Sequence, residues 1–167
     1  MTTAIAVYRA DETPYRVGEV MTGTRKDHIA TLKGGHLLAE QLVRAAHPNG
    51  ADLRANYLYV FRDCDWARKY WVLRGPRYFY EAAVNPADVL HIGDMNIFNQ
   101  IADAKTDKQR DELIRQYWAS EESRDNEKIE FIVRRATVLR VLGSPDDQVA
   151  AEKEWRRNFV GGGAKET

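Results

Sequence analysis

The sequence predicts one α+β domain built on an antiparallel or mixed sheet. Runs of aromatic and β-branched residues, of which 57–61 (YLYVF) is the clearest, are typical of strands. Other segments, such as 29–46, carry apolar residues at helical spacing. Strands and helices do not alternate strictly, and no glycine-rich turn joins a strand to a helix, so Rossmann and P-loop folds are disfavoured.

Length and composition are those of a soluble globular domain. The chain has 167 residues, of which 44% are hydrophobic and 30% charged. We expect residues 1–159 to form a single domain. Residues 160–167 are expected to be a flexible C-terminal tail, because the three adjacent glycines at 161–163 carry a large ordering cost.

The first third of the chain predicts one strand and one helix. Residues 4–9 alternate as a short strand does, and a turn containing Pro14 follows. The helix is predicted over 29–46, with Asp27 as its N-cap. Pro48 and Gly50 are expected to end it. His36 lies on the apolar side of this helix, so we expect it in the core.

The middle of the chain predicts three strands, over 57–61, 77–84 and 89–92. Asp63 or Asp65 is expected to cap a short helix that runs to Trp71. Gly75 and Pro76 then break the chain before the second strand.

The last part of the chain predicts three helices and two strands. Asp94 is expected to open one helix, and Thr106 with Gln109 forms a capping box for the next. The strands are predicted over 129–134 and 137–142, paired as a hairpin. A final helix over 149–159 brings Trp155 next to Phe159.

Charge and cysteine content narrow the functional classes. Twenty-five basic residues balance 25 acidic ones, which argues against general polyanion binding but leaves room for a local basic patch. Cys64 is the single cysteine, and no two histidines have metal-ligand spacing, so we expect neither a disulfide nor a metal site. No signal peptide or membrane-spanning run is visible, so we expect a cytoplasmic protein without a membrane partner.

Glu130 is the most informative carboxylate. In IEFIV at 129–133, strand alternation places Ile129, Phe131 and Val133 on one face and Glu130 on the other, beside Ile132. A carboxylate next to an apolar side chain is a candidate for the floor of a cleft, where desolvation tunes its pKa. The alternative is an exposed glutamate that protects an edge strand from aggregation.

Arg9 and a basic–aromatic segment are the other candidates. Arg9 ends the first strand, where its guanidinium suits a phosphate or a carboxylate; a surface arginine is the alternative. Five basic residues alternate along the chain with the aromatic residues Trp66, Tyr70 and Trp71. Together they could hold nucleic acid through charge and through stacking of bases on the rings. The basic residues are Arg62, Arg68, Lys69, Arg74 and Arg77. Alternatively these aromatic residues are core and the basic ones are solvated. His28 is a candidate binding residue in a loop.

The order of these segments resembles the ADP-ribosyltransferase family. The family's opening strand ends in Arg or His and leads to a hydrophobic–Gly–acid–hydrophobic step, which is similar to VYR at 7–9 and YRVGEV at 15–20. Its middle strands resemble YLYVF at 57–61 and RYFYEAAV at 77–84. The strand of the catalytic glutamate and its hairpin partner resemble EKIEFIV at 127–133 and TVLRV at 137–141. The closest likeness is to small bacterial and phage-related transferases, including toxins.

The resemblance implies a single-domain split-sheet fold with flanking helices, and NAD as co-substrate without a metal. It implies catalytic roles for Glu130 and Arg9. Cleavage of the nicotinamide–ribose bond passes through an oxocarbenium-like state, which a carboxylate stabilises. The residues expected to bind NAD are Tyr8, Arg9, His28, Tyr59, Phe61 and Tyr70.

One departure from the family pattern narrows the classes of molecule that could accept the ADP-ribose group. An E-x-E form would place a carboxylate or Gln at 128, where this chain has Lys128. The family's first glutamate usually serves arginine acceptors, so RNA or DNA is favoured over protein arginine. The bacterial likeness implies a toxin or phage-defence effector with a neutralising antitoxin protein. The alternatives are an NAD hydrolase, an RNA 2′-phosphotransferase, an interaction module that lost activity, or a plain nucleic-acid binder.

Overall fold

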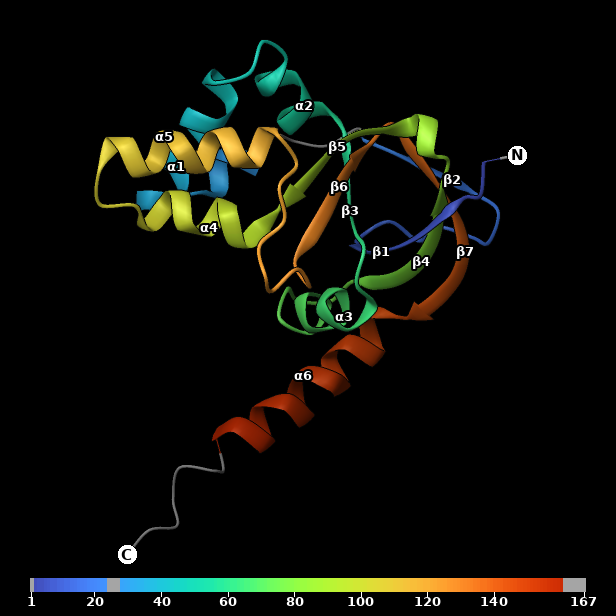
Figure 1. The fold of residues 1–167 in the computed structure, drawn as a ribbon. Helices are drawn as coiled ribbons and strands as arrows, with labels where there is room; N and C mark the ends of the chain where they lie inside the picture. Colours follow the sequence, from blue (N-terminus) through green and yellow to red (C-terminus); the bar gives the residue numbers. More distant parts are fainter. Residues whose placement is uncertain (1, 24–27, 161–167) are drawn as a thin grey trace, which may run out of the picture.

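The computed structural model describes residues 2–23 and 28–160, with residue 160 described by its backbone alone. Within these residues a seven-stranded antiparallel sheet curves around one side of the molecule, and helices cover its ends (Figure 1). The strands are β1 Ile5–Asp11, β2 Val20–Thr22, β3 Leu58–Phe61, β4 Tyr78–Val84, β5 Val89–Asp94, β6 Ile129–Val133 and β7 Arg135–Gly143. The helices are α1 Gly34–Ala45, α2 Gly50–Asn56, α3 Cys64–Val72, α4 Met95–Asp103, α5 Asp107–Trp118 and α6 Pro145–Val160, with 3₁₀ turns η1 His28–Thr31 and η2 Pro86–Asp88.

The sheet consists of two halves that meet at one residue pair. Its order is β2-β7-β4-β1-β3-β6-β5, and every neighbouring pair is antiparallel. β1 pairs with β4 along its whole length, whereas its register with β3 is the single pair of Tyr8 and Phe61. The predicted α+β class is therefore confirmed, and of the two sheet types left open, antiparallel or mixed, the structure has the antiparallel one.

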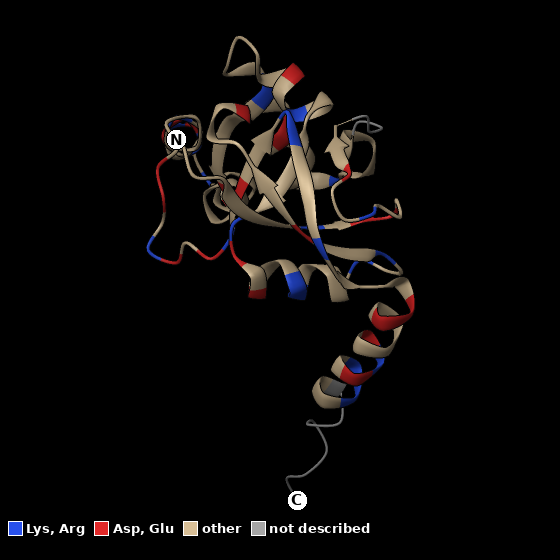
Figure 2. Cartoon of the chain, turned by 90° about the vertical axis from the view of Figure 1, so that its right-hand side faces the viewer, with Lys and Arg blue, Asp and Glu red and all other residues tan. Residues whose placement is uncertain are grey.

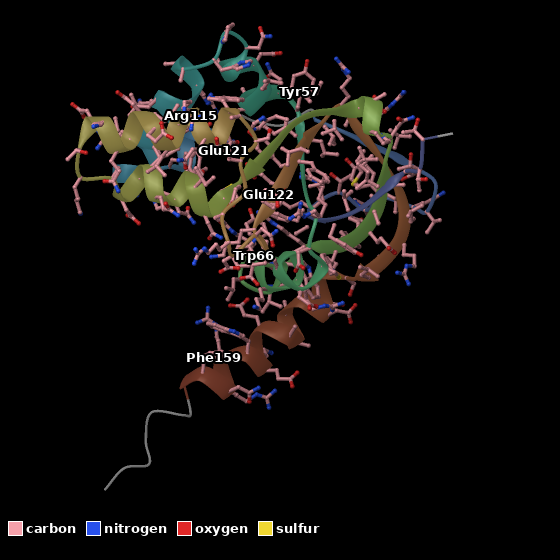
Figure 3. All side chains as sticks on the ribbon, viewed as in Figure 1. Tyr57, Trp66, Arg115, Glu121, Glu122 and Phe159 are labelled. Carbon is pink, nitrogen blue, oxygen red and sulfur yellow. The ribbon has the colours of Figure 1, made fainter. Side chains whose placement is uncertain are left out.

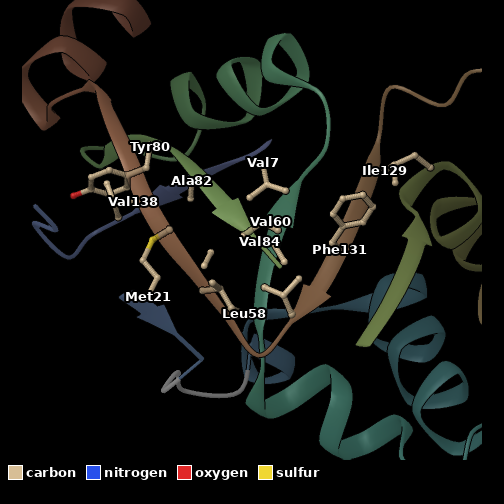
Figure 4. Close-up of a cluster of buried hydrophobic side chains, with 12 residues drawn as sticks. Val7, Met21, Leu58, Val60, Tyr80, Ala82, Val84, Ile129, Phe131 and Val138 are labelled. Atoms are coloured by element: carbon tan, nitrogen blue, oxygen red, sulfur yellow. The ribbon is translucent and has the colours of Figure 1, made fainter. Parts of the chain in front are cut away.

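A common hydrophobic core fills the concave side of both halves (Figure 4). Its members come from every strand except β5: Val7, Met21, Leu58, Val60, Tyr80, Ala82, Val84, Ile129, Phe131, Val133, Ala136 and Val138. All are at most 4% exposed. Since these positions alternate along each strand, the period of two in the sequence accounts for them.

Two further clusters attach the helices. α1, α4 and α5 bury apolar residues against one another next to β5, among them Val43, Ile101 and Leu113. α3 packs Ala67 and Trp71 against the other face of the sheet. α6 leaves the body after contacting α3, and Figure 3 shows Phe159 near its far end. Both signs of charge are spread along α6 (Figure 2).

The capping signals are confirmed. The side chain of Asp63 accepts a hydrogen bond from the Trp66 amide at the start of α3, at 2.7 Å. Asp94 accepts one from the Asn96 amide at the start of α4, also at 2.7 Å. Thr106 accepts one from the Gln109 amide at 3.2 Å, which caps α5. Each oxygen satisfies an amide that has no partner inside its helix.

The predicted hairpin of residues 129–134 and 137–142 is wrong. β6 and β7 are nearly consecutive, but β6 pairs with β3 and β5, and β7 pairs with β2 and β4. One residue, Arg134, separates them, which is too short for a hairpin turn of the usual two or more residues. The chain instead bends there and crosses from one half of the sheet to the other (Figure 4).

The helix predicted over 29–46 begins later, at Gly34. The backbone of Gly34 has φ = 56°, a left-handed conformation that a regular helix cannot continue through, so residues 28–31 form a separate 3₁₀ turn. The predicted N-cap, Asp27, lies outside the described residues. The helix α2 was not predicted, because Pro48 and Gly50 indicate only a stop.

The C-terminal boundary also differs from the expectation. Residue 160, expected in the tail, is the last residue of α6, and residues 161–167 lie outside the described part of the chain. None of the helices in the described part is long and apolar enough to cross a bilayer.

Candidate active site

A cleft of about 530 Å³ opens between the sheet, α3 and the layer of α1 and α4. This volume falls within the range of roughly 300–1,000 Å³ that is usual for small-molecule and cofactor sites. The strands contribute a floor of charged and aromatic side chains, namely Arg9, Tyr59, Phe61 and Glu130. One wall is formed by Trp66, Lys69 and Tyr70 of α3, and the other by His28, His36, Glu40 and Phe98.

Glu130 lies at the floor of this cleft on a central strand. Its neighbours across the ladder are Phe61 on β3 and Gly93 on β5, and it is 4% exposed. The alternative of an exposed edge-strand glutamate is therefore wrong. Its Oε1 lies 3.3 Å from Nη1 of Arg54 and 3.4 Å from the hydroxyl of Tyr117.

Arg54 is a buried guanidinium held from several sides. Its Nε and Nη2 donate to the two carboxylate oxygens of Glu40 at 2.7 and 2.8 Å. Its Nη1 donates to the Tyr117 hydroxyl as well as to Glu130. The rings of Phe98 and Tyr117 have centroids 4.8 and 5.5 Å from its Cζ. Such a planar fork between carboxylates and rings is the arrangement that favours arginine over lysine.

Glu40 brings further polar groups to the same place. Arg44, one turn further along α1, donates to its Oε1 at 2.8 Å, and His28 Nε2 lies 3.4 Å from its Oε2. Burial by itself would raise the pKa of Glu40, but hydrogen bonds from His28, Arg54 and Arg44 outweigh it and lower that pKa well below its usual range. Glu40 is thus a buried, ionised anchor for two arginines.

Glu130 has the opposite electrostatic environment. Complete burial raises its pKa, and the nearby Arg54 charge, with its hydrogen bond, only partly compensates. Burial also raises the pKa of the Tyr59 and Tyr117 hydroxyls, so these remain protonated donors. The pKa values of two carboxylates that contact the same arginine are thus shifted in opposite directions. Such a pair is characteristic of sites that use acid–base or electrostatic catalysis.

Arg9 connects the two halves of the sheet. It is 3% exposed; its Nε donates to Asp11 Oδ2 at 2.8 Å, and its Nη1 donates to the Tyr59 carbonyl on β3. The guanidinium thus bridges β1 and β3 next to the Tyr8–Phe61 pair. The alternative of a surface arginine is wrong, and Arg9 does line the cleft, as predicted.

The structure brings together most of the residues predicted to bind NAD. His28, Tyr59, Phe61 and Tyr70 line the cleft with Arg9. The rings of Phe61 and Tyr70 have centroids 5.1 Å apart. Tyr8 is not among the lining residues, although its ladder partner Phe61 is; its ring centroid lies 6.4 Å from that of Phe79 on the neighbouring strand β4.

The basic residues predicted to bind nucleic acid divide into two groups. Lys69, Arg74 and Arg77 line the cleft, and the guanidinium of Arg74 lies over the Tyr70 ring at 4.4 Å. Arg62 and Arg68 are not among the lining residues. Arg62 instead forms an ion pair with Glu122, which is labelled in Figure 3, at 2.8 Å. The guanidinium of Arg68 lies over the Phe79 ring at 5.3 Å.

The expectation that His36 belongs to the core is wrong. His36 is exposed and lines the cleft, because α1 buries Ala39, Glu40 and Val43 in its place. Glu40 precedes Val43 by three residues on the buried face of α1. A charged residue on an apolar helix face could therefore have marked Glu40 as a candidate site residue from the sequence. Arg54 gave no such signal, because its helix was not predicted.

A second hollow lies on the other side of Tyr117. His91 of β5 is 8% exposed there, with the rings of Tyr117 and Trp118 at 4.9 and 4.7 Å. Burial, helped by the charges of Arg54 and His47, lowers the pKa of His91 to about 4. Asp94 acts as a helix cap and accepts hydrogen bonds from the amides of Asn96 and Ser123.

The described residues contain no group of three or more His, Cys, Asp or Glu side chains placed to hold a metal ion. Comparison with protein-family models gives no match to this chain, and comparison with curated proteins gives none either.

Proposed function

We propose that the protein is an NAD-dependent ADP-ribosyltransferase, with the cleft as its active site and a nucleic acid as the favoured acceptor. The observation that carries this proposal is the placement of Glu130. Its carboxylate is buried at the floor of a cleft of about 530 Å³, next to Arg54 and Tyr117, with aromatic side chains in the walls.

The chemistry that such a carboxylate supports is glycosyl transfer. The bond between C1′ of the ribose and the nicotinamide nitrogen breaks, and its electron pair leaves with nicotinamide. Positive charge then develops on C1′ and the ring oxygen, as in glycoside hydrolysis. A carboxylate in a water-poor cleft stabilises this charge far more than it would in water. A nucleophilic atom of the acceptor bonds to C1′ and releases its proton.

The aromatic walls suit the nicotinamide end of NAD. Phe61 and Tyr70 form a tilted pair on the floor and the α3 wall of the cleft, and a flat ring stacks well on such surfaces. His28 and Tyr59 face each other edge to face at 5.8 Å on the opposite side. Arg9, fixed beside Tyr59, adds positive charge to the floor for a phosphate or a ribose hydroxyl.

The mouth of the cleft supports a nucleic-acid acceptor. Lys69, Arg74 and Arg77 lie together with Trp66 and Tyr70 on α3 and the segment after it. Positive side chains interleaved with rings bind phosphates and unpaired bases. Lys128 lies over the Trp66 ring at 4.7 Å, which adds a further cation where an arginine-modifying enzyme of this kind would carry an acid. A toxin or antiviral effector with a neutralising antitoxin protein is the biological role that we propose for such an activity.

The test is to incubate the purified protein with NAD labelled in the ADP-ribose part, together with RNA, DNA or protein from bacteria. Glu130→Gln is compared with Glu122→Gln, which removes a carboxylate from an exposed ion pair with Arg62. We expect label in a nucleic-acid fraction with wild type and Glu122→Gln, and a loss of at least about 100-fold with folded Glu130→Gln.

The other outcomes separate the remaining hypotheses. Free ADP-ribose without labelled acceptor indicates an NAD hydrolase, which keeps the role of Glu130 but not the acceptor. Label on protein contradicts the preference for nucleic acid. If folded wild-type protein consumes no NAD with any fraction, the transferase proposal is overturned and an interaction module remains.

A further inference from the structure

Four charged side chains form one connected cluster, and three of them line the cleft: the cluster consists of Glu40, Arg44, Arg54 and Glu130, of which all but Arg44 line it. Glu40 and Arg54 are 0% and 3% exposed, and Glu130 is 4% exposed. Two arginines and one ionised glutamate carry a net charge of +1. The cluster becomes neutral only when Glu130 is ionised as well. A buried cluster without net charge is favoured, because burying an uncompensated charge is costly.

The geometry gives Arg54 one fixed orientation. Two hydrogen bonds to Glu40 hold its Nε and Nη2 edge, and the rings of Tyr59, Phe98 and Tyr117 surround its Cζ at 5.4, 4.8 and 5.5 Å. The Nη1 atom is then directed at Oε1 of Glu130 and at the Tyr117 hydroxyl. Tyr117 also reaches Oε1, at 3.4 Å.

We propose that Arg54, clamped by Glu40, is a positioning residue that keeps Glu130 ionised and fixes its Oε1, so that Oε2 is the oxygen presented to the substrate. This inference rests on the proposed function for its consequence, but the ionisation and orientation of Glu130 are properties of the unliganded protein. Among the described residues, Arg54 and Tyr117 both donate to Oε1 of Glu130, as this division of roles requires.

The titration of Glu130 is governed by groups from five elements. Arg54 of α2 and His28 of η1 favour its ionised form, whereas Glu40 of α1 and burial oppose it. Tyr117 of α5 donates to it, and Tyr59 of β3 is coupled to it electrostatically. Arg54 provides the largest favourable contribution, so its removal is the change that tests the inference.

The experiment follows the carboxyl carbon of Glu130 by NMR in protein labelled with ¹³C at the glutamate side chains. The resonance that disappears in Glu130→Gln is assigned to residue 130. Its titration is compared in wild type, in Arg54→Lys and in the double variant Glu40→Gln/Arg54→Gln, which removes both members of a buried ion pair and so guards against loss of folding. Arg44→Gln is the matched control. Arg44, like Arg54, donates a hydrogen bond to Glu40, so this variant removes an arginine from the cluster while leaving Arg54 in place.

We expect Glu130 of wild type to be ionised at pH 7. In the double variant the loss of Arg54 raises the titration midpoint of Glu130 and the loss of the Glu40 charge lowers it. Because Arg54 contributes more than Glu40, we expect a net rise, below the roughly 1–3 pH units usual for losing an opposite charge alone. Arg54→Lys retains the charge but not the fork, so we expect a smaller rise, and Arg44→Gln should change the midpoint less than either.

Two results would overturn the inference. One is a Glu130 midpoint in the double variant that equals that of wild type. The other is a shift in Arg44→Gln as large as that in the double variant, since this would assign the effect to net charge and not to Arg54. A protein that shows the expected titrations but does not consume NAD would contradict the proposed function and leave the role of Arg54 intact.

Discussion

Gly93 on β5 lies directly opposite Glu130 on β6, and the Tyr117 ring occupies the space that a side chain at residue 93 would need. A Cβ built on Gly93 would lie 2.7 Å from Cε2 of Tyr117 and 2.9 Å from its hydroxyl oxygen. The missing side chain therefore allows α5 to place a hydroxyl against the Glu130 carboxylate across the strand.

Gly93→Ala is predicted to impair the site more than the fold. The new methyl group forces the Tyr117 ring to move, and we expect a loss of about 1–3 kcal/mol in the free energy of unfolding. The proposed NAD turnover should fall together with the Tyr117–Glu130 hydrogen bond. Urea denaturation and the labelled-NAD assay measure the two effects. Gly75→Ala is the comparison, because Gly75 has open space around it but a φ of 80°, so alanine strains the backbone there without touching Tyr117. Equal turnover in both variants would show that Tyr117 is not needed.

Glu40→Gln is predicted to destabilise the protein strongly. The variant leaves the buried charge of Arg54 without its two-hydrogen-bond partner, which typically costs about 3–5 kcal/mol. The midpoint of urea unfolding reports this loss. The double variant Glu40→Gln/Arg54→Gln should recover much of it, because neither charge is then left uncompensated. A double variant no more stable than Glu40→Gln would contradict this account.

His91 is predicted to make the protein less stable as the pH falls from 6.5 to 4. Its pKa in the folded protein is about 4, against an ordinary value of 6.5, so the unfolded chain binds the proton more readily. The stability is fully present above pH 6.5 and is lost as the pH approaches 4, by about 3 kcal/mol. Thermal unfolding of His91→Phe should show a flatter pH dependence in this window. Parallel curves for the two proteins would rule out His91 as the cause.

Lys69 and Arg74 are predicted to contribute to nucleic-acid binding where Arg68 does not. Both line the cleft, whereas Arg68, on the same helix as Lys69, lies over the Phe79 ring. Each lost phosphate contact should weaken binding of a single-stranded oligonucleotide and reduce the slope of log K against log salt by about 0.7. Arg68→Gln serves as the matched control. An equal loss in all three variants would indicate a diffuse charge effect instead of a binding face at the cleft.

The local elements were largely predictable because their signals are local. Asp63, Asp94 and Thr106 cap the helices for which they were proposed, since capping depends on three or four neighbouring residues. The strand containing Glu130 was found by its alternation, and the predicted cleft residues Arg9, Tyr59 and Tyr70 do lie together. Whether they bind NAD stays a prediction.

What could not be predicted depends on contacts between distant segments. The pairing of β6 with β3 and β5 is decided by the common core, and nothing within 129–142 distinguishes it from a hairpin. Arg54 and Tyr117 reach Glu130 from 76 and 13 residues away in the sequence. Tyr8 does not line the cleft although its neighbour Arg9 and its ladder partner Phe61 do, and no local signal separates them.

The common core has a consequence for how the sheet comes apart. β1 and β3 share a single ladder pair, so the backbone ladder by itself would let the two halves open independently. Yet Val7 and Tyr80 from one half and Val60 and Phe131 from the other are buried in the same cluster. Neither half can expose its apolar face without exposing that of the other. Amides in the middle of β4 and β6 should therefore exchange with solvent through one shared global opening and show the same free energy, despite belonging to different halves.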